Sequence, residues 1–404
     1  MILKIDRGVA VGKVNAPASK SMAHRLLICA AMCRGESVIR NIPLCEDILA
    51  TIDCLRALGV KIELNGCDAM VIGTDLTTTV ANRSLECRKS GSTLRFLIPI
   101  SVLSGNNTTF VGSERLMSRP LSVYDRLFKE QGFIFNKNGE SISVCGKLSA
   151  GEYFIDGNVS SQFISGLMLA LSAIYGDSKI IVNTEIESRP YVDMTISALK
   201  EFGIKVFPDT DYSFLILGGQ QHNAREITVE GDWSGAAFLH ALNSLGGKIE
   251  VGGLNNESLQ GDRMCINYFA MLDKGYCEID ISNCPDLGPI LFTVAAVKGG
   301  AKFIGTRRLR DKESNRIECM KKELEKFGAK LIVEENSVTV VKCELHSPND
   351  ILSGHNDHRI VMSLAVLCTL YGGKIDGCEA AKKSYPEFFG HLKDLGIKFV
   401  QIDN

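Results

Sequence analysis

The chain has 404 residues, which suggests two or three domains, and its formal net charge of -2 argues against a dedicated binder of nucleic acid or of a membrane surface. Hydrophobic residues make up 45% of the chain and charged residues 23%, as in an ordinary globular protein. The 14 cysteines are scattered, with no CxxC pair and no partnering histidine cluster, so they favour a reducing compartment, the cytoplasm, over a zinc site or a disulfide framework.

The N-terminal segment MILKIDRGVAVGKV predicts a strand. It is not interpreted as a signal peptide, because it lacks a charged start followed by an apolar centre. The longest apolar stretches, Gly166–Tyr175 and Ile360–Tyr371, are too short and too interrupted to span a bilayer. We therefore expect no membrane partner.

Six apolar helices are predicted along the chain, each directly after a short polar segment. These segments read ASKS, KSGS, VSSQ, GDWS, NCPD and HNDH. Marker positions within them are separated by 71, 70, 73, 52 and 71 residues, and the markers are Lys20, Gly91, Ser161, Ser234, Asp286 and Asp357. Because these helices are apolar nearly all round, we expect them to be buried.

A second series of six helices runs in step with the first, and each of its members ends at a glycine that precedes a short strand. The glycines are separated by 73, 71, 72, 53 and 68 residues, and they are Gly59, Gly132, Gly203, Gly275, Gly328 and Gly396. Each fits the C′ position of a helix, where the backbone turns left-handed. The two series share the short fourth interval, so together they predict six homologous units of about 70 residues.

Six units, each with two helices and several short strands, most naturally form an α/β protein of two domains with three units each. The segment Asn223–Glu230 is the expected crossover, since the fourth unit begins just after it. We assign residues 1–13 and 228–404 to one discontinuous domain and residues 14–227 to the other.

The starts of these helices are candidate anion sites, because free N–H groups and a partial positive charge meet there. Taken alone, Ser, Gly and Asp at such positions indicate helix capping. Cationic side chains recur at the same places, against the helix dipole, which favours ligands that carry several phosphates and carboxylates. These side chains are Lys20, Arg25, Lys89, Arg95, Arg119, Arg189, Lys312, Arg316, Arg359 and Lys383, with His358 beside them.

Few acidic residues accompany these cations. Asp286 follows Pro285 at a helix start, and Glu313 stands beside Lys312. Asp286 is either a helix cap or the acceptor of a proton from a hydroxyl nucleophile. Rival motifs, namely GxxxxGK[ST], GxGxxG after a strand, HExxH and GxSxG, do not occur in the sequence.

Ten short motifs follow one another in the chain: PASKSMAHR, SGSTLRF, RLMSRP, NVSSQF, SRPY, GDWSGAAF, CPDLGP, RLRDKESNR, NDHR and KSYPEFF. In this order and spacing, over essentially the whole length, they resemble the 3-phosphoshikimate 1-carboxyvinyltransferases, also called 5-enolpyruvylshikimate-3-phosphate (EPSP) synthases. The resemblance implies an inverse α/β barrel of two domains, each built from three βαβαββ units, with the active site in the interdomain cleft.

The resemblance also implies the reaction. The enolpyruvyl group of phosphoenolpyruvate passes to the 5-hydroxyl of shikimate 3-phosphate by addition and then elimination of phosphate, in the shikimate pathway to chorismate and the aromatic amino acids. Cationic side chains neutralise the substrates, so no metal and no cofactor is expected. We further expect a monomer, and sensitivity to glyphosate in the phosphoenolpyruvate pocket.

Site residues carry over from the family motif by motif. The groups implied to be catalytic are Asp286, Glu313, Lys312 and Lys20. Those implied to contact shikimate 3-phosphate are Lys20, Ser21, Arg25, Ser160, Ser161, Ser188, Tyr191, Asp286 and Lys312. Those implied to contact phosphoenolpyruvate are Lys20, Gly91, Arg119, Gln162, Arg316, Arg359 and Lys383, with Arg95 expected behind them.

Two positions depart from the family pattern. Lys89 stands where an asparagine is usual beside the phosphoenolpyruvate pocket, and Arg308 stands where an asparagine often contacts shikimate 3-phosphate. Neither contact is therefore carried over.

Three other functions compete with this interpretation. The sister enzyme that uses UDP-N-acetylglucosamine shares the fold but carries a catalytic-loop cysteine, where this chain has RLMSRP. An RNA 3′-phosphate cyclase would need a nucleotide site and a catalytic histidine, for which His358 is the candidate. A polyanion-binding module would show one broad basic face and no pair of acids.

Overall fold

The computed structural model describes residues 1–78 and 83–402. The chain forms two compact units: unit 1 comprises Met1–Pro17 and Gly231–Asn404, and unit 2 comprises Ala18–Glu230. These limits differ by a few residues from the expected boundaries at 13 and 228. The reason is that β2 (Val11–Asn15) pairs along its whole length with β15 (Lys248–Gly252), which holds β2 in unit 1.

Within the described residues, unit 2 contains three four-stranded sheets that share one plan. The first two strands of each sheet are parallel and the others antiparallel, in the orders β14-β3-β5-β4, β6-β7-β9-β8 and β10-β11-β13-β12. Their bounds are β3 (Glu36–Arg40), β4 (Lys61–Asn65), β5 (Asp68–Ile72), β6 (Arg83–Glu86), β7 (Thr108–Val111), β8 (Ile134–Lys137), β9 (Ser141–Cys145), β10 (Glu152–Ile155), β11 (Ser178–Val182), β12 (Val206–Thr210), β13 (Ser213–Ile216) and β14 (Glu226–Thr228).

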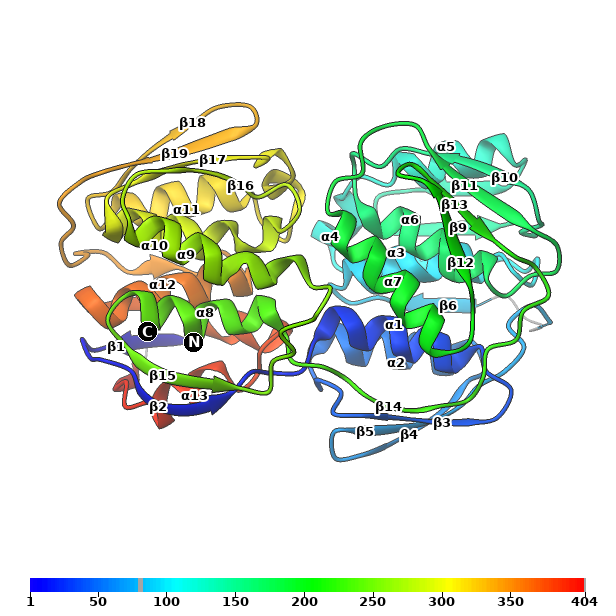
Figure 1. Cartoon of the computed structure of the whole chain (residues 1–404), viewed down its shortest axis with the longest axis horizontal. Coiled ribbons are helices and arrows are strands. Elements are labelled where there is room, and N and C mark those ends of the chain that lie inside the picture. Colours follow the sequence, from blue (N-terminus) through cyan, green and yellow to red (C-terminus); the bar gives the residue numbers. More distant parts are fainter. Residues whose placement is uncertain (79–82, 403–404) are drawn as a thin grey trace. The chain divides into compact units, whose positions relative to one another are not determined.

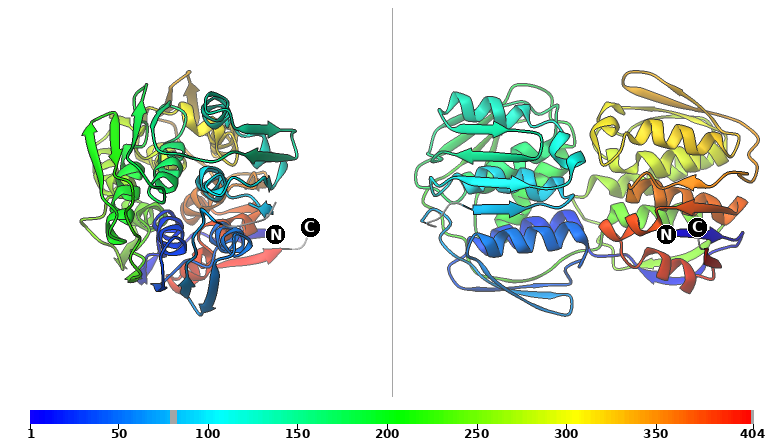
Figure 2. Two further views of the ribbon diagram at one scale, coloured as in Figure 1. Left: turned by 90° about the vertical axis from the view of Figure 1, so that its right-hand side faces the viewer. Right: turned by 180° about the vertical axis from the view of Figure 1, so that it is seen from behind.

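The helices of unit 2 lie inside these sheets (Figure 1, Figure 2). The three apolar ones, α1 (Lys20–Ala31), α3 (Gly91–Ser101) and α6 (Ser161–Leu171), are buried along most of their length. The remaining helices are α2 (Glu46–Ala57), α4 (Glu114–Ser118), α5 (Ser122–Glu130) and α7 (Arg189–Glu201). This arrangement, with helices at the centre and sheets around them, is the inverse α/β barrel that the family resemblance implies.

Unit 1 follows the same plan with one sheet reduced to two strands. Its sheets have the orders β20-β21-β1-β22, β16-β17-β19-β18 and β15-β2. The further strands are β1 (Ile2–Ile5), β16 (Glu278–Asp280), β17 (Ala301–Ile304), β18 (Lys330–Val333), β19 (Ser337–Val341), β20 (Leu352–Ser353), β21 (Gly373–Asp376) and β22 (Phe399–Ile402).

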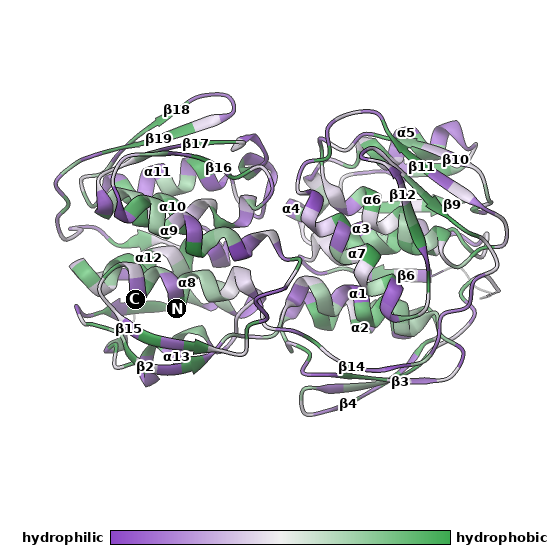
Figure 3. Ribbon diagram, viewed as in Figure 1, coloured by the Kyte–Doolittle hydropathy of each residue, from purple (hydrophilic) through white to green (hydrophobic). Residues whose placement is uncertain are grey.

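The helices of unit 1 alternate between a buried and an amphipathic type. They are α8 (Trp233–Ser244), α9 (Cys265–Asp273), α10 (Gly288–Lys298), α11 (Arg316–Glu325), α12 (His358–Tyr371) and α13 (Phe388–Asp394), with 3-10 turns η1 (Gly261–Met264), η2 (Pro285–Leu287), η3 (Arg307–Asp311) and η4 (Cys378–Lys383). Figure 3 shows the contrast between the hydrophobic α10 and the more hydrophilic α11. Within the two described ranges, no helix is long and apolar enough to cross a membrane.

The short fourth interval of the repeat has a structural cause. In unit 2, α2 is followed by the antiparallel pair β4–β5, whereas in the fourth repeat only residues 274–277 separate α9 from β16. The fourth repeat therefore lacks this hairpin, and its sheet is the parallel pair of β15 with the N-terminal β2. The last repeat is completed by β1, which pairs with β21 and β22.

The two series of markers lie where the sequence predicts. All six repeat glycines have positive φ, from 71° at Gly132 to 122° at Gly275, as a helix C′ position requires. Five apolar helices begin within one residue of their markers; the exception is α10, which begins at Gly288 after the turn η2 that contains Asp286.

Candidate functional site

Unit 2 presents its first group of predicted residues on α1. Ser19 caps this helix, since its Oγ accepts a hydrogen bond from the Met22 amide at 3.3 Å. Lys20 Nζ donates to Asp47 Oδ2 at 2.8 Å, and the two side chains are 15% and 5% exposed. Asp47 on α2 thus pairs with the lysine that was predicted to contact both substrates, a partner that the sequence analysis missed.

The guanidinium of Arg25 binds three oxygens of unit 2. Its Nε donates to Thr195 Oγ1 at 2.8 Å, its Nη1 to the Ser21 carbonyl at 2.6 Å and its Nη2 to the Tyr191 carbonyl at 2.7 Å. Burial lowers the pKa of Arg25 to about 10. The structure therefore brings Tyr191, 166 residues further along the chain, into contact with Arg25, which also contacts Ser21.

A second group in unit 2 surrounds Gly91 at the start of α3. A Cβ atom on Gly91 would lie 2.6 Å from Arg119 Nη1 and 2.9 Å from Arg95 Nη1, so both guanidinium groups reach this glycine. Arg95 Nη1 donates to Gln162 Oε1 at 2.9 Å, and Gln162 Nε2 donates to Ser92 Oγ at 2.9 Å. Arg95 therefore fixes the orientation of the Gln162 amide.

Three of the four predicted serines of unit 2 stand at the starts of α6 and α7. Ser160 caps α6, its Oγ accepting from the Gln162 amide at 3.4 Å, and Ser161 is the first residue of that helix. Ser188 precedes α7 with φ of 58°, a left-handed conformation that is uncommon outside glycine and often marks a functional site.

Arg316 is the centre of the group in unit 1. Its Nε donates to Asp357 Oδ2 at 2.9 Å, its Nη1 to Asp286 Oδ1 at 2.8 Å and its Nη2 to Glu313 Oε2 at 2.8 Å. The Arg316 side chain is 1% exposed. One buried cation thus holds three carboxylates, and Asp357, which the sequence analysis used only as a helix marker, is one of them.

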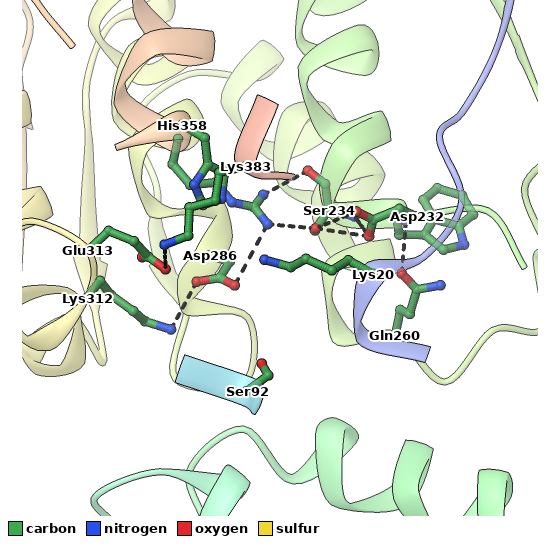
Figure 4. Close-up of polar contacts among 12 residues, drawn as sticks. Lys20, Ser92, Asp232, Ser234, Gln260, Asp286, Lys312, Glu313, His358 and Lys383 are labelled. Atoms are coloured by element: carbon green, nitrogen blue, oxygen red, sulfur yellow. Dashed lines mark hydrogen bonds and ion pairs between the residues drawn. The ribbon is translucent and has the colours of Figure 1, made fainter. Parts of the chain in front are cut away.

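Two lysines complete this network (Figure 4). Lys312 Nζ lies 2.9 Å from Asp286 Oδ1, and Lys383 Nζ donates to Glu313 Oε1 at 3.0 Å. Asp286 remains 25% exposed, whereas Lys312 and Glu313 are each 15% exposed. Asp286, Lys312 and Glu313 are therefore paired with protein groups but remain partly exposed to solvent.

Arg359 extends the network to α8. Its Nη1 donates to the Ser234 carbonyl at 2.9 Å and its Nη2 to Ser234 Oγ at 2.7 Å. Its Nη2 also lies 3.8 Å from Asp286 Oδ2. Asp232 caps α8 and accepts from the Ser234 amide at 3.1 Å, so the two helix starts are joined through serine.

The charges around Asp286 set its protonation state. Burial alone would raise its pKa, but Lys312, Arg359 and Arg316 hold the pKa of Asp286 well below its usual range. The carboxylate of Asp286 therefore stays ionised among these cations. Asp286 does not cap a helix with its side chain, which leaves its oxygens to these contacts.

The pKa of Lys312 is also lowered, which in an amine favours the neutral form. Burial lowers the pKa of Lys312 to about 8, and the nearby Arg308 and Arg316 act in the same direction, while Asp286 opposes them. An amine with this pKa exchanges a proton near neutral pH, which is what acid–base catalysis asks of a side chain.

Arg189, another cation at a predicted helix start, has two acceptors within unit 2. Its Nε donates to Asp193 Oδ1 at 2.9 Å and its Nη1 to the Asp211 carbonyl at 2.7 Å. Among residues 1–78 and 83–402, no three His, Cys, Asp or Glu side chains are grouped so that they could hold a metal ion.

The fold and these residues define a class: a two-domain inverse α/β barrel with clusters of cations at helix starts in both units. Within this class, the profile of the family described as EPSP synthase (3-phosphoshikimate 1-carboxyvinyltransferase) matches residues 7–274 and 268–392, and the chain belongs to this family.

Individual relatives agree. The chain is 38% identical to the 3-phosphoshikimate 1-carboxyvinyltransferase of Clostridium beijerinckii, over 98% of each chain, and 39% identical to that of Clostridium novyi, over 98% of this chain and 97% of the relative. The EPSP synthase of Acinetobacter baumannii, 20% identical, superposes with a TM-score of 0.80 over 100% of both chains. The enolpyruvyl transferase NikO from Streptomyces tendae, 14% identical, does so with a TM-score of 0.77 over 99% of this chain and 98% of its own. These two structures support the fold.

Proposed function

We infer that this chain transfers the enolpyruvyl group of phosphoenolpyruvate to the 5-hydroxyl of shikimate 3-phosphate, releasing phosphate. The observation that carries the inference is the network in which Asp286, Lys312, Glu313 and Arg316 are in contact, in a chain 38% identical to enzymes of that name over 98% of its length. The reaction places the chain in the shikimate pathway, ahead of chorismate and the aromatic amino acids.

The chemistry proceeds in two steps. The methylene carbon of phosphoenolpyruvate takes up a proton, and the 5-hydroxyl oxygen bonds to the neighbouring carbon as the hydroxyl loses its proton. The methyl group then gives up a proton, the carbon–oxygen bond to phosphate breaks, and the enol ether forms. No oxidation or reduction occurs, so the demand on the protein is to bind anions and to move protons.

Asp286 is the proposed acceptor of the hydroxyl proton. Its low pKa keeps it ionised and ready to accept a hydrogen bond from the 5-hydroxyl. A carboxylate of low pKa is a weak base. It therefore takes the proton only as the 5-hydroxyl oxygen bonds to carbon, because this bond makes the hydroxyl proton strongly acidic.

Lys312 and Glu313 are the proposed partners of the methylene carbon and the leaving phosphate. Lys312, with a pKa of about 8, can hold or release a proton near neutral pH. Glu313 accepts hydrogen bonds from both Arg316 and Lys383, which orient its carboxylate for proton exchange.

The substrate contacts are proposed from the family motifs. For shikimate 3-phosphate they are Lys20, Ser21, Arg25, Ser160, Ser161, Ser188, Tyr191, Asp286 and Lys312; for phosphoenolpyruvate they are Lys20, Gly91, Arg119, Gln162, Arg316, Arg359 and Lys383. The clusters around Arg25 and Gly91 support this division, because each gathers residues assigned to the same substrate. The cluster around Arg316 joins the two sets, since Arg316 contacts Asp286. We further propose that the chain acts in the cytoplasm as a monomer, without nucleic acid.

A phosphate-release assay tests the proposal. The protein is incubated with phosphoenolpyruvate and either shikimate 3-phosphate or UDP-N-acetylglucosamine, and the product is identified by mass spectrometry. We expect phosphate and an enolpyruvyl product only with shikimate 3-phosphate. Turnover with the nucleotide sugar alone would assign the chain to the sister reaction, and turnover with neither would overturn the proposal.

A further inference from the structure

Helix α11 contacts the loop before α12 at two points. At its N-terminus, Arg316 binds Asp357 through Nε and Oδ2 at 2.9 Å. At its C-terminal end, Glu323 accepts from the Ser353 amide at 2.9 Å and from His355 Nε2 at 2.8 Å. Residues seven apart lie on the same face of an α-helix, so Arg316 and Glu323 contact the loop from the same side.

The loop between these points has an unusual backbone. His355 and Asn356 have φ of 48° and 52°, two consecutive left-handed residues directly before Asp357. For residues other than glycine this conformation costs free energy and persists only where the surroundings hold it. The preceding Gly354 has no room for a side chain, because a Cβ there would lie 2.5 Å from Val361 Cγ2 and 2.7 Å from the Asp376 carbonyl.

Glu323 supplies the restraint that this backbone needs. The Glu323 side chain is 0% exposed. It also accepts a hydrogen bond from Lys326 Nζ at 2.7 Å, and Lys326 Nζ donates as well to the Ile351 carbonyl at 2.9 Å. Because an ionised carboxylate only accepts hydrogen bonds, His355 Nε2 is the donor in their contact. A buried carboxylate with these donors forms a rigid support for the loop.

The pKa shifts of His355 and Glu323 indicate that the two side chains form an ion pair. Contacts with Cys319 and Glu323 raise the pKa of His355 to about 9. Burial opposes ionisation of Glu323, but hydrogen bonds from His355 and Lys326 lower its pKa. His355 is therefore a cation at neutral pH.

We propose that Glu323 and His355 are positioning residues that fix the loop carrying Asp357, and through Asp357 the orientation in which Arg316 binds phosphoenolpyruvate. Neither side chain is proposed to touch a substrate. The inference rests on the proposed function for the identity of the ligand, whereas the mechanical link from Glu323 to Arg316 stands on the contacts alone.

The first test is Glu323→Gln, which keeps the size of the side chain and removes its charge. We expect the Michaelis constant for phosphoenolpyruvate to rise about tenfold, the usual scale for a residue that acts through others, with that for shikimate 3-phosphate unchanged. His355→Asn, whose asparagine tolerates a left-handed backbone but cannot reach Glu323, should give the same split. Lys302→Gln, which breaks the exposed Lys302–Glu278 pair, is the matched control and should leave both constants unchanged.

A second measurement does not depend on turnover. In protein labelled with ¹⁵N-arginine, the Arg316 Nε–H signal, assigned with Arg316→Lys, should be protected from exchange with water in the parent and exchange faster in Glu323→Gln and His355→Asn. Thermal unfolding shows whether each variant is folded. A parent without activity would reject the proposed function, while faster exchange in the variants would still support the link from Glu323 to Arg316.

Two results would overturn the inference. Folded variants with an unchanged Arg316 signal would show that Glu323 does not position this side chain. Variants that lose stability but change both Michaelis constants equally would show that the pair serves the fold alone.

Discussion

The guanidinium of Arg316 and the carboxylate of Asp357 form a fully buried ion pair, 2.9 Å from Nε to Oδ2, with side chains 1% and 0% exposed. Asp357 accepts from Nε and, at 3.3 Å, from Nη2 of Arg316, while Nη1 donates to Asp286 and Nη2 also donates to Glu313. The position of both acids therefore depends on one arginine, and a change at either acid alters the charge balance of the whole network.

Asp286 is expected to matter for turnover more than for binding. Asp286→Ala should fold, bind shikimate 3-phosphate and lose about a hundred- to ten-thousand-fold in kcat, the usual contribution of a proton acceptor. Phosphate release and calorimetric titration measure the two effects. Asp273→Asn, at an exposed surface pair with Lys298, is the control. Near-parental kcat in Asp286→Ala would reject the role as a base.

Gly91 tests how the site separates two ligands. Gly91 is not among the glycines with positive φ, so an alanine fits the backbone, but its Cβ would lie 2.6 Å from Arg119 Nη1. We expect the parent to be inhibited by glyphosate. In Gly91→Ala the inhibition constant for glyphosate should rise more than the Michaelis constant for phosphoenolpyruvate, since glyphosate is the longer molecule.

The control for Gly91→Ala is Gly390→Ala, because no atom lies within 4 Å of a Cβ built on Gly390 in α13. That variant should be unchanged in both constants and stabilised by about 1 kcal/mol, the difference in helix propensity between glycine and alanine. Equal losses for both ligands in Gly91→Ala would reject the steric explanation, and a resistant parent would reject the expected sensitivity.

Lys312 should give the rate a dependence on alkaline pH. Burial lowers its pKa to about 8, so the protonated amine is lost as the pH rises through that value, and kcat of the parent should fall with it. Lys312→Arg stays charged far above pH 8 and cannot release its proton. We expect a low kcat in this variant with no fall near pH 8, whereas a fall like that of the parent would assign the titration to another group.

Arg25 is expected to stabilise unit 2 through its three acceptors. Arg25→Lys keeps the charge but offers a single nitrogen, so at least one buried acceptor loses its donor, at a cost of about 1–3 kcal/mol in the free energy of unfolding. Arg126→Lys, at the half-exposed pair with Asp156, should cost less than about 1 kcal/mol. Denaturant unfolding compares the two. Equal costs would show that the Arg25 contacts contribute little.

His355 should contribute stability that depends on pH. Its pKa is raised from 6.5 to about 9 in the folded protein, so its contribution is complete below 6.5 and is lost as the pH rises through 9. The stability difference between the parent and His355→Asn should therefore be larger at pH 6 than at pH 9.5. A difference that is constant over this range would show that the ion pair with Glu323 does not stabilise the fold.

Much of the fold follows from local patterns in the sequence. A glycine is favoured at C′ wherever a helix ends in a left-handed residue, and a buried helix is apolar all round. The six repeats can therefore be predicted from Gly59, Gly132 and the four equivalent glycines, together with the apolar helices. The cations at helix starts can also be predicted from the sequence, because a positive charge at a helix N-terminus opposes the helix dipole and is unusual unless an anion binds there.

The partners of those cations were decided only by tertiary structure. Asp47 meets Lys20, and Asp357 meets Arg316, across 27 and 41 residues of sequence. No local pattern specifies such pairs, because a side chain's contact depends on how whole helices pack. The same holds for β1 and β2, which pair with β21 and β15 much later in the chain, because strand pairing depends on long-range packing. In the fourth repeat, which lacks the hairpin, β2 is the partner strand of β15.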